Sequence, residues 1–192
     1  MFFNHKDAEQ NQNHNPFFYY GGNYPGETTE PFYHSGVTEY TLRVSVSTHI
    51  GKVRGNHEDN FYLEGLYMND IFRNDFSASY TVRSADGMTF AVFDGMGGAA
   101  YGEVASEIAV RTLRKYEKKL KYADGTRMLD QLVSSYTTEA NDAICDMLTE
   151  KHCAVGGTTF SMLYFMGDAV KLYYLGDSRM YRYQSDGLTR LT

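Results

Sequence analysis

Residues 89–98 read TFAVFDGMGG, a short apolar run that ends at Asp94 and continues into three glycines among the next four residues. The run predicts a buried strand, which would hold the Asp94 carboxylate at its tip in a fixed position. The glycines allow a sharp turn and a close approach of a ligand to the main chain. A carboxylate held in this way suits a metal ion, although a strand followed by a plain glycine turn is the alternative interpretation.

Composition limits the classes of protein to consider. The chain has 192 residues, 42% of them apolar and 22% charged, which fits one globular domain with a sizeable core. Its net charge of −6 argues against a nucleic-acid partner, because proteins that bind the phosphate backbone carry a broad basic face. No apolar run is long enough to cross a bilayer, and residues 1–7 do not resemble a signal peptide. We therefore expect no membrane partner and a cytoplasmic location.

Two regions of different composition divide the chain. Residues 1–36 hold all three prolines, repeated asparagine and glutamine and many aromatic residues, but no valine, isoleucine or leucine. Such a segment buries too little branched aliphatic surface to offset its ordering entropy, so we predict a disordered tail rich in asparagine and aromatic residues. Residues 37–192 are predicted to form the folded domain.

Hydrophobic periodicity predicts strands on both sides of a pair of helices. Alternating or continuous apolar runs predict strands at 42–47, 61–63, 89–93, 157–165, 170–175 and 179–183. Apolar residues at helical spacing predict amphipathic helices over 104–118 and 129–147. We interpret 64–87 as an irregular connection, and 166–168 and 176–178 as tight turns. Because strands joined by tight turns are usually antiparallel, this order predicts an α+β fold, an antiparallel β-sandwich flanked by helices.

Acidic residues stand at the ends of three predicted strands. Glu58 and Asp59 come just before the second strand, Asp94 follows the third, and Asp177 lies in a turn between the last two. Clusters of oxygen ligands bind hard divalent ions such as magnesium or manganese, and the carbonyl of Gly95 would add one more oxygen. Each acidic residue taken alone is equally well explained as a solvated or capping residue of a turn.

Arg54 precedes Glu58 by four residues in the segment VRGNHED at 53–59. Its guanidinium group would bind a phosphate in bidentate fashion beside a metal centre. The alternative is a surface arginine paired with the neighbouring carboxylates. We interpret His57 as a lone histidine of a polar loop, with no role as a ligand or general acid.

Four segments together resemble the metal-dependent serine/threonine protein phosphatases, the PPM or protein phosphatase 2C type. They are VRGNHEDNF (53–61), VFDGMGGAAYGEVAS (92–106), GGTTFSMLYF (156–165) and LYYLGDSRMYRY (172–183). The DGMGG motif is similar to the bacterial branch of that family. The resemblance implies that residues 37–192 form the N-terminal part of a catalytic domain that dephosphorylates phosphoserine and phosphothreonine in proteins. It also implies a signalling role, with phosphorylated proteins and a serine/threonine kinase as partners.

The resemblance also implies a role for each acidic residue. Asp94 would bridge two Mn²⁺ or Mg²⁺ ions, and the Gly95 carbonyl and Glu58 would help to hold the second ion. Asp59 would support this shell, and Asp177 would belong to a third, weaker metal site. A water activated between the two ions would then attack the phosphorus atom of the substrate.

The resemblance makes Arg54 the residue that holds the phosphoryl oxygens, so Arg54 and Asp94 are the expected catalytic residues. Met96 stands where some relatives carry a histidine proposed to protonate the leaving group, which leaves the general acid unidentified. Ala99 stands where many bacterial relatives carry histidine, and we expect little consequence from this difference. The family continues beyond the position of Thr192 into helices and strands that supply two more metal-binding aspartates. We therefore expect an incomplete domain, with weak metal binding and weak or no turnover by the chain alone.

A non-catalytic reading is the main alternative. The same fold would then serve as a pseudophosphatase or a phosphoprotein-binding regulatory domain; retention of Arg54, Glu58 and Asp94 argues against it, and the missing aspartates argue for it. A cysteine-based phosphatase is excluded, because no arginine stands six residues after Cys145 or Cys153. The glycines after Asp94 are not followed by the Gly-Lys-Ser/Thr ending of a P-loop.

Overall fold

The structure, a computed structural model, describes residues 41–69, 75–83, 87–96, 101–166 and 169–192. The predicted tail at 1–36, the glycines at 97 and 98, Ala99 and part of the predicted turn at 166–168 lie outside the described residues. In chain order the elements are β1 (Thr41–Thr48), β2 (Asn60–Leu63), β3 (Leu66–Tyr67), β4 (Phe76–Arg83), β5 (Thr89–Phe93), α1 (Gly102–Lys121), α2 (Gly125–Glu150), β6 (Phe160–Met166), β7 (Ala169–Leu175), β8 (Tyr181–Gln184) and β9 (Gly187–Arg190).

A five-stranded antiparallel sheet forms the centre of the molecule, with the strand order β3-β2-β5-β6-β7. Strand β5 lies in its interior, where Ala91 pairs with Tyr62 of β2 on one side and Met162 of β6 on the other. The alternate residues Ala91 and Phe93 are buried, as expected for a strand with one face on the main core. The prediction of a rigid strand that ends at Asp94 is confirmed.

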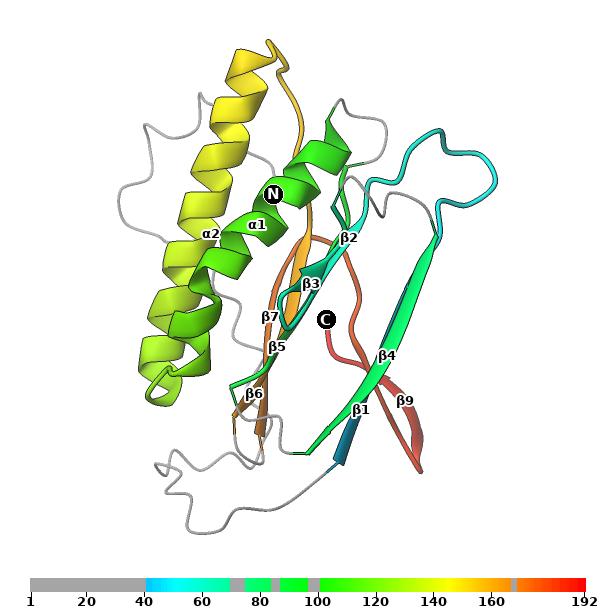
Figure 1. Cartoon of the computed structure of the whole chain (residues 1–192), viewed down its shortest axis with the longest axis vertical. Helices are drawn as coiled ribbons and strands as arrows, with labels where there is room; N and C mark the ends of the chain where they lie inside the picture. The colour runs from blue at the N-terminus through cyan, green and yellow to red at the C-terminus, as the bar shows by residue number, and fades with distance from the viewer. Residues whose placement is uncertain (1–40, 70–74, 84–86, 97–100, 167–168) are drawn as a thin grey trace.

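The two helices lie side by side on one face of this sheet (Figure 1). Their apolar residues pack against the inner side chains of β2, β5 and β6 to form the main core. Tyr136 Oη of α2 donates to the Ala109 carbonyl of α1 at 3.3 Å and joins the two helices, and Tyr164 Oη of β6 donates to the Leu120 carbonyl of α1 at 2.8 Å and joins the sheet to the helices. Neither helix is long and apolar enough to cross a membrane.

A two-stranded antiparallel ribbon, β1 and β4, covers the opposite face of the central sheet (Figure 1). A second, smaller core fills part of the space between them, where the rings of Phe61 and Phe76 stack with centroids 5.5 Å apart. The rest of that space is an apolar groove of about 410 Å³, which we call the intersheet groove. Val92 of β5 lines it and is 49% exposed, so solvent reaches the middle of the central sheet.

The stretch 64–87 is more regular than predicted. It contains β3 and β4, and residues 76–82 alternate between half-buried and exposed side chains as β4 pairs along the whole of β1. The prediction of an irregular connection was therefore wrong. The period-2 pattern was present in FSASYTV, but its small and polar residues made it weaker than the patterns of the aliphatic strands.

Two other boundaries differ from the prediction. Strand β6 begins at Phe160, because the preceding residues 157–159 instead bond to the backbone just after β5. The strand predicted at 179–183 is the first half of a hairpin, in which β8 pairs with β9.

Candidate metal centre

Thr159 holds both the backbone amide and the backbone carbonyl of Asp94. The Asp94 amide donates to Thr159 Oγ1 at 3.0 Å, and the Thr159 amide donates to the Asp94 carbonyl at 2.8 Å. Thr159 Oγ1 also shares a hydrogen bond of 2.7 Å with the hydroxyl of Ser178, the residue after Asp177. The corner that carries Asp94 is therefore tied to the turn that carries Asp177.

Gly95 brings the loop of Glu58 against this corner. Its amide donates to the Glu58 carbonyl at 3.2 Å. A Cβ atom on Gly95 would lie 2.4 Å from the carbonyl oxygens of Glu58 and Gly102, far inside van der Waals contact. Three backbone segments thus cross at Gly95, and only glycine fits between them.

The carboxyl groups at this corner repel one another. Burial, followed by hydrogen bonding and charge repulsion from Asp59 and by the charge of Asp177, raises the pKa of Asp94. The positive charge of Arg54 acts in the opposite direction and lowers this pKa. Asp59, Asp177 and Arg54 are therefore all close enough to act electrostatically on Asp94.

Arg54 forms an ion pair with Glu58, the contact that the alternative interpretation of Arg54 expects. The side chain of Glu58 is 13% exposed and that of Arg54 is 56% exposed, so the guanidinium group stays open to solvent while it covers the carboxylate. An open guanidinium group keeps donors available for a second anion.

A polar cavity of about 230 Å³ lies beside these groups. Its lining residues are His49, Ile50, Arg54, Asn56, His57, Glu58, Asp59 and Asp94. The structure therefore brings together four of the six predicted site residues around one space, with Gly95 in the backbone directly behind. Asp177 does not line this cavity and acts on it through its charge.

The donor set at this corner fits a hard divalent cation. Glu58, Asp59 and Asp94 offer carboxylate oxygens, and the mutual repulsion that raises the pKa of Asp94 is a repulsion that a cation would relieve. Within the described part of the chain, no three His, Cys, Asp or Glu side chains already converge as a preformed metal-binding group.

Comparisons with known proteins place the chain in a family. A sequence profile described as Protein phosphatase 2C matches residues 66–192, more than half of the chain. The chain belongs to the protein phosphatase 2C family. The serine/threonine protein phosphatase PstP of Mycobacterium tuberculosis is 30% identical over 152 residues, which cover 79% of this chain and 24% of PstP.

Solved structures of protein phosphatase 2C type share the fold. The catalytic domain of PstP in complex with two manganese ions matches with a TM-score of 0.57 and 27% identity, over 81% of this chain and 56% of that one. Stp1 from Staphylococcus aureus matches with a TM-score of 0.58 over 85% of this chain and 57% of Stp1, and at 17% identity it supports the fold alone. The α+β fold predicted from the sequence is confirmed. The chain spans a little over half the length of these structures.

Thr159 and Ser178 are two residues of the phosphatase 2C corner whose function the sequence did not reveal. The sequence placed Thr159 in the strand predicted at 157–165 and Ser178 in the turn at 176–178, with no further role for either. The hydrogen bond between their hydroxyl groups, which are 19 positions apart in the chain, links the Asp94 corner to the Asp177 turn. The motifs GGTTF and GDSR contain both residues, but spacing alone does not say which hydroxyl faces which strand end.

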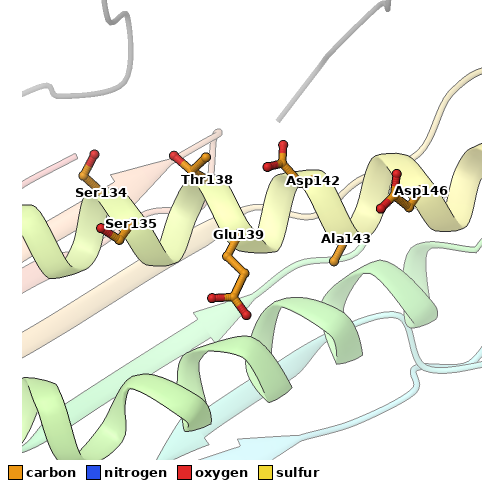
Figure 2. A pocket seen from close by; sticks show the side chains of 7 residues that line it. All are labelled: Ser134, Ser135, Thr138, Glu139, Asp142, Ala143 and Asp146. Carbon is orange, nitrogen blue, oxygen red and sulfur yellow. The ribbon is translucent and has the colours of Figure 1, made fainter.

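A second surface feature of this phosphatase 2C chain has no part in the corner. It is an open, polar depression on the outer side of α2, lined by Ser134, Ser135, Thr138, Glu139, Asp142, Ala143 and Asp146 (Figure 2). Thr138, Asp142 and Asp146 point away from α1, and Glu139 points toward it (Figure 2). Asp142 therefore provides an acidic control residue that is not part of the candidate metal centre.

Proposed function

We propose that this chain carries the metal- and phosphate-binding corner of a protein phosphatase that hydrolyses phosphoserine and phosphothreonine. The observation that carries the proposal is the convergence of Glu58, Asp59, Asp94 and Arg54 around one polar cavity. Carboxylates for cations and a guanidinium group for a phosphoryl group are the two components that phosphoryl transfer to water requires.

In this proposal Glu58, Asp59, Asp94 and the Gly95 carbonyl hold two Mn²⁺ or Mg²⁺ ions. When bound, the ions supply a water of lowered pKa as the nucleophile and neutralise charge on the phosphoryl group. The chain itself keeps these metal-binding oxygens in place. Thr159 holds the backbone amide and carbonyl of Asp94, and the Gly95 amide holds the Glu58 carbonyl. Asp177, tied to the same corner, would hold a third, weaker ion.

Arg54 binds the phosphoryl oxygens in this proposal. Its guanidinium group is exposed and lies beside Asp94. When a phosphate arrives, Arg54 would exchange its present anionic partner, Glu58, for the phosphate. This exchange would leave Glu58 available to a cation. Arg54 is thus proposed to bind substrate, and the general acid stays unassigned.

The relatives support the substrate class. PstP is a serine/threonine protein phosphatase and its catalytic domain has been solved with two manganese ions. By analogy we propose that this protein acts on phosphorylated proteins in the cytoplasm, alongside a serine/threonine kinase. We also propose that residues 37–192 are the N-terminal part of the catalytic domain and that 1–36 form a separate tail.

Mn²⁺ binding and hydrolysis by the full chain test the proposal. Titration calorimetry with MnCl₂ and hydrolysis of p-nitrophenyl phosphate are measured for the wild type, Asp94→Asn and Asp142→Asn. We expect weak but saturable Mn²⁺ binding in the wild type and Asp142→Asn and weaker binding in Asp94→Asn, and any slow Mn²⁺-dependent hydrolysis by the wild type should be kept in Asp142→Asn and lost in Asp94→Asn. Equal Mn²⁺ affinity in all three proteins would overturn the assignment of Asp94.

Arg54→Ala separates the phosphatase from the non-catalytic alternative. We expect it to raise KM for p-nitrophenyl phosphate by roughly tenfold or more, because a charge-assisted hydrogen bond to phosphate is lost, and to leave Mn²⁺ affinity unchanged or tighter. If the wild type binds Mn²⁺ and a phosphothreonine peptide but hydrolyses neither that peptide nor p-nitrophenyl phosphate, the chain is a phosphoprotein-binding domain instead.

A further inference from the structure

His57 is buried between the candidate metal centre and helix α1. Only 6% of its surface is exposed, although it lies in a polar loop between Arg54 and β2. Its Nδ1 accepts a hydrogen bond of 3.3 Å from the backbone amide of Asp59. Because Nδ1 is an acceptor, the proton of the neutral ring is on Nε2.

The Nε2 atom of His57 is buried and has no hydrogen-bond partner among the described groups. A buried N–H without an acceptor is costly, so such an atom in a native protein usually bonds to an ordered water. The sequence did not predict this burial, since His57 was interpreted only as a lone histidine of a polar loop with no role as a ligand or general acid.

A small, partly open cavity adjoins the imidazole ring. It measures about 10 Å³ and is lined by His57, Asp59, Asn60, Met68, Asn69, Glu103, Ser106 and Glu107. This volume is close to the minimum that one water requires, and the lining offers the polar partners that a buried water needs.

We propose that His57 is a positioning residue for Asp59. Its Nδ1 holds the Asp59 amide, and its Nε2–H donates to one water buried in the small cavity. The water in turn links the loop to the first turns of α1, where Glu103 and Glu107 provide acceptors. Asp59 lines both this cavity and the 230 Å³ cavity of the metal centre, so the position of its carboxylate depends on this support.

A direct contact already joins the same two elements. Asn56 Nδ2 of the loop donates to Glu103 Oε2 of α1 at 3.1 Å. The proposed water adds a second link beside the first, so that the loop is held to α1 at two points. Two attachments fix the orientation of a loop where one leaves it free to pivot.

NMR of the full chain tests the proposal without any metal. At pH 8 the ¹⁵N shifts of the imidazole should show Nε2 protonated and Nδ1 unprotonated. In the variant His57→Asn, the side-chain oxygen lies near the place that Nδ1 of His57 occupies. In His57→Gln, the side-chain amide lies near the place of Nε2 instead. We therefore expect the Asp59 amide to exchange about tenfold faster in His57→Gln and His57→Ala, and within about threefold of the wild type in His57→Asn. A proton on Nδ1, or equal exchange in all variants, would overturn the proposal.

The consequence for metal binding rests on the proposed function and has its own measurement. Mn²⁺ affinity should fall roughly tenfold in His57→Gln and His57→Ala and stay within about twofold in His57→Asn. Tyr136→Phe, which removes a buried hydrogen bond in the helical core, is the control for general loss of stability and should keep wild-type affinity. If Asn weakens Mn²⁺ binding as much as Ala, His57 does not act through Nδ1. If the wild type binds no Mn²⁺, the metal centre fails while the exchange data still decide the role of His57.

Discussion

At the scale of single residues, the positive charge of Arg54 partly offsets the negative charges around Asp94. Arg54 is paired with Glu58, and it also lowers a pKa of Asp94 that burial, Asp59 and Asp177 raise. A divalent cation among the carboxylates would take over the neutralising role of the guanidinium group. Arg54 would then be available to a phosphate, which couples metal binding to substrate binding at one side chain.

Gly95 allows a prediction at this scale. Gly95→Ala should lower the free energy of unfolding by at least about 2 kcal/mol, because the new Cβ would meet two backbone oxygens at 2.4 Å and backbone cannot move aside cheaply. Urea denaturation followed by circular dichroism measures the change.

Gly55→Ala is the matched control for Gly95→Ala. No heavy atom lies within 4 Å of the Cβ position at Gly55, so this change should alter the free energy of unfolding by no more than about 1 kcal/mol. Similar unfolding midpoints for the two variants would mean that the three backbone segments do not cross tightly at Gly95.

Four of the residues that the sequence predicted for the candidate metal centre, Arg54, Glu58, Asp59 and Asp94, line one cavity. Acidic residues at strand ends were expected to meet, and the Gly95–Glu58 backbone bond shows how the loop and strand are joined. The sequence did not predict the Thr159 anchor or the burial of His57. Both depend on which side chains face each other across segments distant in the chain, and no local pattern contains that information.

At the scale of elements, Glu139 connects the two helices. It accepts a hydrogen bond of 2.8 Å from Lys115 and one of 3.0 Å from the hydroxyl of Tyr116. These bonds, Lys115 first, lower the pKa of Glu139. A carboxylate whose pKa is lower in the folded state stabilises the fold above its unfolded pKa, and this contribution is lost as pH falls through the folded value.

Glu139→Gln therefore has a predictable pH dependence. At pH 7 it should lower the free energy of unfolding by less than about 1 kcal/mol, because the carboxylate is largely exposed to solvent. The difference from the wild type should shrink as pH falls below about 4.5. Urea midpoints at pH 7 and pH 4 measure it, with Asp142→Asn, one turn further along α2, as the control. A difference that grows toward acidic pH would contradict the assignment.

Long elements were predicted better than short ones. Helices α1 and α2 follow from many apolar residues at helical spacing, and both form. Strands β4 and β9 were missed, and their sequences show why. In β4, serine and threonine alternate with only moderately apolar residues. In β9, most side chains are exposed, so no alternation of apolar and polar residues marks the strand.

At the scale of the whole molecule, the two sheets are not fully closed against each other. Val92 belongs to an interior strand and is still 49% exposed, because the intersheet groove runs beside it. Apolar surface of this kind binds hydrophobic dyes. The groove should therefore be detectable in the folded chain.

A dye-binding experiment tests this. The full chain should enhance the fluorescence of 8-anilinonaphthalene-1-sulfonate, and Val92→Asn should reduce the enhancement by roughly half while near-UV circular dichroism is kept. Val170→Asn is the control, since Val170 is 42% exposed on β7 and does not line the groove. Equal fluorescence for both variants would show that the dye binds elsewhere.

The hydrogen bond from the Asp94 amide to Thr159 joins residues 65 positions apart. While the chain emerges from a ribosome, Asp94 appears well before its anchor, and both helices are synthesised in between. The acidic corner therefore cannot take its final geometry until β6 arrives. A nascent chain arrested shortly before Thr159 would carry Glu58, Asp59 and Asp94 but would lack both Asp177 and the Thr159 anchor of Asp94. Capture of a metal ion should therefore be among the last events of its biogenesis.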